Sequence, residues 1–147
     1  MPIYQFVKSL TPRQQRDVRD LYRSAGWWFA ADENRPHLLS RIIAGSHCFC
    51  IALEGEAVIG IGRAISDGVS DAYLQDITVR ADFRRQGIGL KLTKFIVDSL
   101  KDNGIHWIGL IATPDSHEIY KALGFKDLSE DKAMRLNLHD TPGESAC

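Results

Sequence analysis

The sequence has little of several features that would place it in a special class. Its 147 residues carry a formal net charge of −1 with 25% charged residues, so no excess of one sign points to nucleic acid or to an anionic membrane. No apolar run approaches the roughly 20 residues of a membrane-spanning helix, and the first residues lack the apolar core of a signal peptide. We therefore expect one domain located in the cytoplasm, since this length suffices for a substantial core.

Cysteine is also scarce, with only Cys48, Cys50 and Cys147 in the chain. An odd number argues against a disulfide framework. A closed zinc site needs four ligands at workable spacing, and His47 beside the first two cysteines does not supply them. We interpret Cys48 and Cys50 as small core residues and expect no metal.

Two familiar phosphate-binding loops are missing. No Gly-Lys pair is followed by Ser or Thr, and the three ordered glycines of the dinucleotide fingerprint are absent. What the chain does have is Arg84-Arg85-Gln86-Gly87-Ile88-Gly89, between a strand-like run and a long amphipathic segment. The two glycines let amides at the start of a helix converge on one anion, and the two arginines add positive charge. This stretch predicts an anion site for a ligand other than ATP or NAD.

The hydrophobic periodicity predicts an α+β domain over residues 1–138, followed by a disordered tail at 139–147. We expect helices at 12–25, 36–44, 88–103 and 117–123, with Thr11 and Gln14 forming a capping box at the first. We expect strands at 3–7, 48–53, 57–65, 73–79, 107–112 and 132–138. Within 73–79, we expect an uninterrupted alternation of side chains. The helix between the fourth and fifth strands, and the apolar character of the fifth, predict a parallel crossover.

Three aromatic residues, Trp27, Trp28 and Phe29, follow the first predicted helix with no clear period. Aromatic residues in a connecting segment can fill a core or line a pocket for a second ligand, and both interpretations stay open.

Two motifs together resemble the GNAT superfamily of N-acetyltransferases. The stretch Arg84-x-x-Gly87-x-Gly89 is similar to the family's loop for the pyrophosphate of acyl-coenzyme A (CoA), and Tyr120-x-x-Leu123-Gly124-Phe125 is similar to its C-terminal motif. The resemblance implies the GNAT fold, a single-domain mixed β-sheet made of an antiparallel meander plus a splayed parallel pair, with helices on both faces. The run Tyr73-Leu74-Gln75-Asp76, after Asp67-Gly68, looks like a branch that acts on small amines.

The resemblance also implies residue roles. Acetyl-CoA would lie between strands 77–79 and 107–112, its pantetheine arm pairing as a substitute strand. The implied cofactor-binding residues are Ile77, Thr78, Val79, Arg84, Arg85, Gln86, Gly87, Ile88, Gly89 and Leu90. Tyr120 matches the general acid that protonates the leaving thiolate, although a core aromatic is the other interpretation. Relatives often place a glutamate on the strand before the loop; here we expect a water relay touching Gln75 or Asp76 to remove the proton of the amine.

These residues predict transfer of an acetyl group from acetyl-CoA to a small primary amine by direct attack in a ternary complex. Trp27, Trp28 and Phe29 are the expected acceptor residues. Two alternatives stay open: acetylation of a protein N-terminus or lysine, and a noncatalytic sensor that binds acyl-CoA. Many members of the superfamily are dimers, so the resemblance also implies a homodimer as one assembly of this chain.

Overall fold

The computed structural model describes residues 1–138, so the predicted tail at 139–147 lies outside the described residues. The described strands are β1 (Ile3–Phe6), β2 (Cys48–Glu54), β3 (Ala57–Ser66), β4 (Asp71–Val79) and β5 (Trp107–Gly109). The described α-helices are α1 (Pro12–Ser24), α2 (Ala30–Glu33), α3 (Leu38–Gly45), α4 (Ile88–Asp102) and α5 (His117–Ala122). None of them has both the length and the apolar character needed to cross a membrane.

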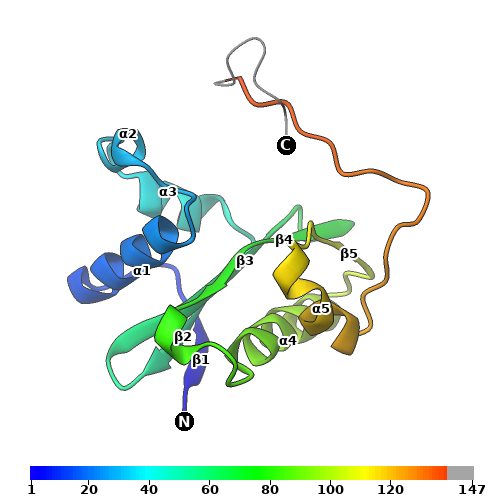
Figure 1. The fold of residues 1–147 in the computed structure, drawn as a ribbon, viewed down its shortest axis with the longest axis horizontal. Coiled ribbons are helices and arrows are strands. Elements are labelled where there is room, and N and C mark those ends of the chain that lie inside the picture. The colour runs from blue at the N-terminus through cyan, green and yellow to red at the C-terminus, as the bar shows by residue number, and fades with distance from the viewer. Residues whose placement is uncertain (139–147) are drawn as a thin grey trace.

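The strands form one sheet in the order β1-β2-β3-β4-β5. Neighbours from β1 to β4 are antiparallel, and β4 and β5 are parallel. Helices α1 and α3 pack on one face, and α4 packs on the other (Figure 1). The predicted α+β architecture, with a meander, a parallel pair and helices on both faces, is confirmed.

Local sequence signals explain the first helix. The Oγ1 of Thr11 accepts the N–H of Gln14 at 3.2 Å, and Gln14 Oε1 accepts the N–H of Thr11 at 3.0 Å, which confirms the predicted capping box. Val18, Leu21 and Tyr22 then repeat at helical spacing and are buried against the sheet. Cys50 lies in the core on the α4 side of the sheet, as predicted, and burial raises the pKa of its thiol to about 12.

The predicted alternation along β4 is wrong beyond Gln75. Ala72 and Leu74 belong to the core under α4, and so do Ile77 and Val79, so the inward-facing side changes parity within the strand. The change occurs at Asp76, whose φ is 57°, where the register with β3 shifts between Ile61 and Arg63. This is a β-bulge, in which one additional residue reverses the faces of a strand.

The predicted strand at 107–112 is only Trp107–Gly109, and it pairs with Asp71–Tyr73 of β4. The pairing ends at Tyr73 and Gly109, just before the bulge at Asp76, and a bulge bends the strand that contains it. The predicted strand at 132–138 is also wrong, because residues 126–138 form no helix or strand. The segment runs past α5 and away from the sheet (Figure 1), leaving Met134, Leu136 and Leu138 between 84% and 89% exposed.

The single-turn helix α2 is not predicted by the sequence pattern, which has too few residues there to show a period. Helix α3 begins at Leu38, two residues later than Pro36, because His37 has a left-handed φ of 58° and breaks the helical path. Ser116 precedes α5 without a side-chain cap, since its Oγ bonds Thr113 instead.

Candidate functional site

The site begins where β4 and β5 stop pairing. Their parallel register ends at Tyr73 and Gly109, and β4 continues to Val79. Along residues 75–79, the edge of β4 that faces β5 therefore has no ladder from that neighbour. Strand N–H and C=O groups require partners when they are removed from water. An extended ligand with amide groups could supply them, and the predicted residues Ile77, Thr78 and Val79 lie here, half-buried.

The N-terminus of α4 lies at the end of this opening. Its N-cap is Gly87, with a left-handed φ of 77° and no side-chain cap, and the first turn contains no acidic residue. The first amides of a helix have no partner within it and carry partial positive charge. Ile88, Gly89 and Leu90 hold these amides, so this end of α4 suits an anion. The side chain of Ile88 is buried in the core, which leaves only its backbone for a ligand.

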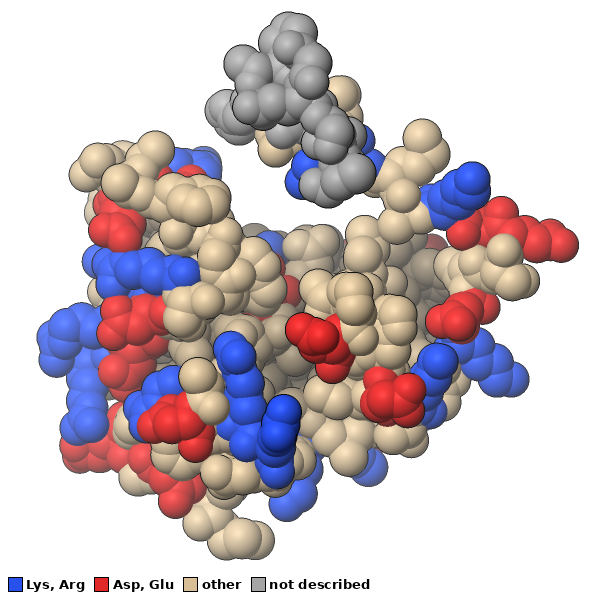
Figure 2. All heavy atoms as spheres, viewed as in Figure 1, with Lys and Arg blue, Asp and Glu red and all other residues tan. Residues whose placement is uncertain are grey.

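Exposed basic residues precede that helix. Arg84, Arg85 and Gln86 are all exposed, and Arg84 donates from Nε to the carbonyl of Val79 at 3.1 Å, which ties the turn to the end of β4. Arg85 has a left-handed φ of 63°. Figure 2 shows this face hollowed between the side of α1–α3 and the side of α5, with Lys and Arg side chains at the lower rim.

Helix α5 brings Tyr120 to the same region. Its neighbour Ile119 lies over the start of α4, since Ile119 Cδ1 is 3.4 Å from the position of a Cβ on Gly89. Tyr120 packs edge-on against Phe125 with ring centroids 5.9 Å apart. Burial raises the pKa of the Tyr120 phenol above its ordinary value, and a hydrogen bond with Ser116 opposes that shift. The phenol therefore keeps its proton and can donate it.

The three predicted acceptor aromatics separate in the structure. Trp28 stacks on Tyr22 with centroids 4.4 Å apart and an interplanar angle of 15°. Trp27 meets the same ring edge-on and is 42% exposed, and Phe29 is 69% exposed. Trp28 is thus a packing residue, whereas Trp27 and Phe29 offer apolar surface.

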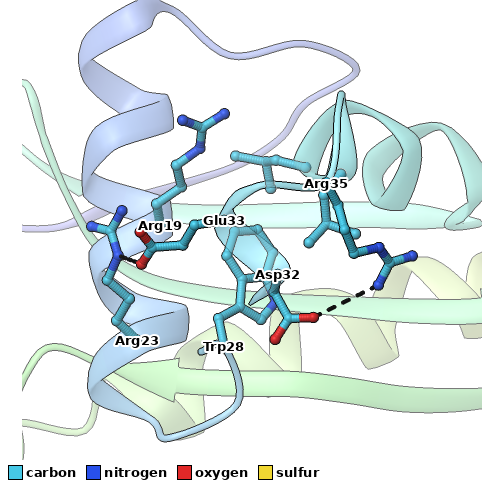
Figure 3. A pocket seen from close by; sticks show the side chains of 8 residues that line it. Arg19, Arg23, Trp28, Asp32, Glu33 and Arg35 are labelled. Atoms are coloured by element: carbon cyan, nitrogen blue, oxygen red, sulfur yellow. Dashed lines mark hydrogen bonds and ion pairs between the residues drawn. The ribbon is translucent and has the colours of Figure 1, made fainter. Parts of the chain in front are cut away.

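A small cavity of about 100 Å³ lies beside Trp28, between α1 and the α2–α3 segment (Figure 3). Most of the charged side chains that line this cavity form ion pairs with one another. Arg23 pairs with Glu33 and Asp20, and Arg35 lies 3.8 Å from Asp32. These pairs leave little acidic character with which to hold a cationic amine.

Asp76, predicted to take part in proton removal, lies in an ion pair. Its Oδ2 accepts hydrogen bonds from Arg63 Nε and from the Tyr22 hydroxyl, both at 2.7 Å. Burial and the Asp76 carboxylate raise the pKa of Tyr22 strongly, so this phenol stays neutral. Arg63 also reaches Gln75 Oε1 at 3.5 Å, so Gln75 and Asp76 share one face of the sheet.

The sequence interpretation missed Arg63 and Tyr22. A signal for Arg63 was available, because it is a charged residue within the apolar run of β3. Tyr22 gave none, since it lies on the apolar face of α1 among residues of the same period.

A larger cavity of about 260 Å³ lies between β1 and the turn before α4, and two of the predicted cofactor-binding residues, Gln86 and Ile88, line it. Tyr4 and Glu54 line it, and the Tyr4 hydroxyl and one Glu54 carboxylate oxygen are buried without a partner among the described residues.

Comparison with known proteins agrees with this geometry. A model of the acetyltransferase (GNAT) family matches residues 9–125. An uncharacterized N-acetyltransferase ycf52 from Gracilaria tenuistipitata var. liui is 38% identical over 109 residues, covering 74% of this chain and 60% of that protein. A thialysine N-epsilon-acetyltransferase from Bos taurus is 38% identical over 84 residues, covering 52% of this chain and 49% of that protein. The chain thus spans about half to three-fifths of these relatives.

Solved structures share the fold. The GNAT family acetyltransferase SP0256 from Streptococcus pneumoniae TIGR4 superposes with a TM-score of 0.76 at 26% identity, covering 95% of this chain and all of that one. A predicted acetyltransferase from Clostridium acetobutylicum, solved with acetyl-CoA, has a TM-score of 0.67 at 20% identity, covers 94% of this chain and 97% of its own, and so shows the fold alone. The predicted GNAT fold is confirmed. Since the family model covers both the Arg84–Gly89 turn and the Tyr120–Phe125 motif, this chain belongs to the GNAT family of acetyltransferases.

Proposed function

We propose that this protein transfers an acetyl group from acetyl-CoA to a primary amine by direct attack in a ternary complex. One observation carries the proposal: the parallel pairing of β4 and β5 ends after three residues, next to the uncapped N-terminus of α4. The groove offers unpaired strand edges for the pantetheine arm and convergent amides for the pyrophosphate.

Residues of the turn hold the donor. The amides of Gln86 to Leu90 face the pyrophosphate, Gly87 and Gly89 allow its close approach, and Arg84 or Arg85 neutralises its charge. On β4, the amides near Ile77 and Val79 pair with pantetheine and polarise the acetyl carbonyl, as an oxyanion hole does. Thr78 lies between these two residues on β4 and is the third residue of this strand that we assign to the donor site.

The reaction joins the nitrogen of a neutral amine to the carbonyl carbon and breaks the C–S bond. An alkyl amine with a pKa near 10.4 arrives protonated at neutral pH, so one proton must leave first. We assign this step to a water relay beside Gln75 and Asp76. The thiolate that departs takes a proton from Tyr120, whose phenol is kept protonated by burial. The nitrogen of the new amide gives up its additional proton through the same relay, and solvent returns a proton to the Tyr120 phenolate.

The proposed acceptor is a small amine, and an aromatic one fits the exposed surfaces of Trp27 and Phe29. The Bos taurus relative named for thialysine supports an amine acceptor of small size. The free thiols of Cys48 and Cys50 support a reducing compartment such as the cytoplasm. A homodimer stays a prediction, for which the exposed side chains of Met134, Leu136 and Leu138 offer apolar surface.

Release of CoA thiol from acetyl-CoA tests the proposal, with phenethylamine, tyramine, putrescine and lysine as small acceptors and histone-tail peptides as protein acceptors. We expect at least one small amine to raise thiol release well above hydrolysis, with the N-acetyl product seen by mass spectrometry. Preference for the peptides would favour the protein-acetylating alternative. Tight binding of acetyl-CoA with no productive acceptor would favour the sensor.

A further inference from the structure

The bend in β4 depends on one residue with an unfavourable backbone. Asp76 has a φ of 57°, and here Asp76 and Ile77 together face the single β3 residue Gly62. Aspartate enters the left-handed region more readily than most residues with a side chain, because its carboxylate can hydrogen-bond nearby groups that hold it there. The contacts of the Asp76 side chain therefore decide whether the bulge persists.

Two donors from different elements hold that side chain. Tyr22 of α1 and Arg63 of β3 each donate to Asp76 Oδ2 at 2.7 Å. The side chains of Arg63 and Asp76 are only 15% and 20% exposed. Water thus competes weakly, which strengthens both bonds.

Each donor is itself fixed in place. Arg63 donates from a terminal nitrogen to Ser46 Oγ at 3.3 Å, at the end of α3. Tyr22 is 2% exposed, and its ring stacks on Trp28 and meets Trp27 edge-on. The carboxylate is therefore held from two directions by side chains that cannot easily turn away.

The bulge determines what β4 presents to the groove. Successive strand amides point to opposite edges, so one inserted residue reverses which N–H groups face β3 and which face the opening. Ile77 and Val79 follow the bulge directly, and both keep their side chains in the α4 core because of it. Loss of the left-handed turn at Asp76 would redirect their amides as well as their side chains.

We propose that Tyr22 and Arg63 are positioning residues for acetyl transfer, which hold the Asp76 bulge and so aim the amides of Ile77 and Val79 at the thioester. The proposal rests on the proposed function, in which these amides polarise the acetyl carbonyl. In this proposal, the Asp76 carboxylate accepts the hydrogen bonds of Tyr22 and Arg63. The ion pair between Arg63 and Asp76 thus supports the reaction by fixing the backbone of β4.

The test compares Tyr22→Phe, Arg63→Met, Asp76→Ala and Asp76→Asn with the wild type. Asparagine tolerates a left-handed backbone and keeps an oxygen for both donors, so it is the conservative variant. Tyr4→Phe is the matched control, because the Tyr4 hydroxyl is buried without a partner among the described residues. Two quantities are measured: exchange of the Thr78 amide, which lies next to the bulge in the pairing with Ile61 of β3, by NMR without ligand, and kcat and KM for acetyl-CoA with phenethylamine as acceptor.

We expect Tyr22→Phe, Arg63→Met and Asp76→Ala to speed exchange of the Thr78 amide by about tenfold or more, and to lower kcat by about tenfold to a hundredfold, with a smaller rise in KM. Asp76→Asn should restore slow exchange of this amide, since it keeps an oxygen for both donors, whatever the loss of its carboxylate does to the proposed water relay. Tyr4→Phe should leave exchange and kcat unchanged. Unchanged exchange and kcat in the folded Tyr22 and Arg63 variants would overturn the proposal. So would an Asp76→Asn variant whose amide exchanges as fast as that of Asp76→Ala, since a side chain that accepts both donors would then not hold the bulge.

A second Arg63 variant and the exchange measurement cover two cases, a variant that does not fold and a wild type without activity. If Arg63→Met does not fold, Arg63→Lys keeps the charge but loses the planar fork, and the same increase in exchange is expected of it. If the wild type transfers no acetyl group to any amine, the proposed function fails. Amide exchange, which needs no acceptor, still shows whether Tyr22 and Arg63 hold the bulge.

Discussion

Gly62 lies against Ile77 at the bulge: a Cβ on Gly62 would be 3.1 Å from Ile77 Cγ1, and 3.0 Å from Ile96 Cδ1. These distances are tighter than ordinary carbon contacts, so a methyl group on Gly62 would crowd the bulged residue and the core of α4. Two side chains would have to shift to admit a methyl group.

Gly62→Ala should therefore lower the free energy of unfolding by about 1–3 kcal/mol, the usual cost of overpacking a core. Gly60→Ala is the matched control, since its Cβ would meet neighbours at ordinary contacts of 3.4 Å or more. Urea denaturation of the three proteins measures the difference. Equal losses in the two variants would show that crowding at the bulge is not the cause.

Gly87→Val should weaken acetyl-CoA binding by more than about tenfold, because a branched side chain would enter the space of the pyrophosphate. Gly104→Val is a suitable control: both glycines have positive φ and open space around the Cβ position, but Gly104 lies at the other end of α4. Both variants should lose about 1 kcal/mol of stability through backbone strain. Calorimetric titration measures the Kd of each variant for acetyl-CoA, and only Gly87→Val should weaken it, because only that side chain would exclude the pyrophosphate. Similar affinities in the two variants would contradict the phosphate site.

Tyr120→Phe should lower kcat by about a hundredfold or more while the Kd for acetyl-CoA stays within about twofold, because general acid catalysis contributes in that range and the hydroxyl acts only in the reaction. Thiol release and calorimetry give the two numbers. Unchanged turnover would leave Tyr120 as a packing partner of Phe125.

The pH dependence of kcat/KM should reflect the protonation states of the Tyr120 phenol and of the acceptor amine. Tyr120 must be protonated to act as the acid, and burial raises its pKa, so the protonated form persists to higher pH. The acceptor amine must be neutral, so activity should climb as pH rises from 6 to 9, with no decline below about pH 10. A fall in kcat/KM between pH 8 and 9 that disappears in Tyr120→Phe would contradict this assignment.

Two buried phenols should differ in their effect on stability. Tyr22→Phe removes a donor from Asp76 and should cost about 1–3 kcal/mol, whereas Tyr4→Phe removes a hydroxyl with no partner and should be neutral or stabilising. Thermal melts of both variants compare them directly. A larger loss for Tyr4→Phe would mean that its hydroxyl is hydrogen-bonded in solution.

Much of the fold follows from local sequence signals. The capping box at Thr11 and the apolar periods of α1 and α4 are short-range features, and the glycine-containing turn before α4 is visible in the sequence. The bulge at Asp76 could not be predicted in the same way. It depends on Tyr22 and Arg63, which lie 54 and 13 residues away along the chain, and on the absence of a side chain at Gly62.

The ends of the strands also could not be predicted from the sequence. Residues 107–112 and 132–138 have the composition of strands, but a strand forms only where a neighbour offers a paired edge. The bend in β4 withdraws that edge after Tyr73, a consequence of tertiary structure that no local pattern records. The arrangement of Trp28 behind Tyr22 is likewise decided by packing between elements.

The short pairing between β4 and β5 has a thermodynamic consequence. A donor that lies along β4 would supply the backbone hydrogen bonds that the sheet does not make for itself, so acetyl-CoA would be a structural component of the folded protein as well as a reactant. The melting temperature should then rise with donor concentration, and the chain in a cell rich in acetyl-CoA would be more resistant to unfolding than the same chain in one that is starved of it.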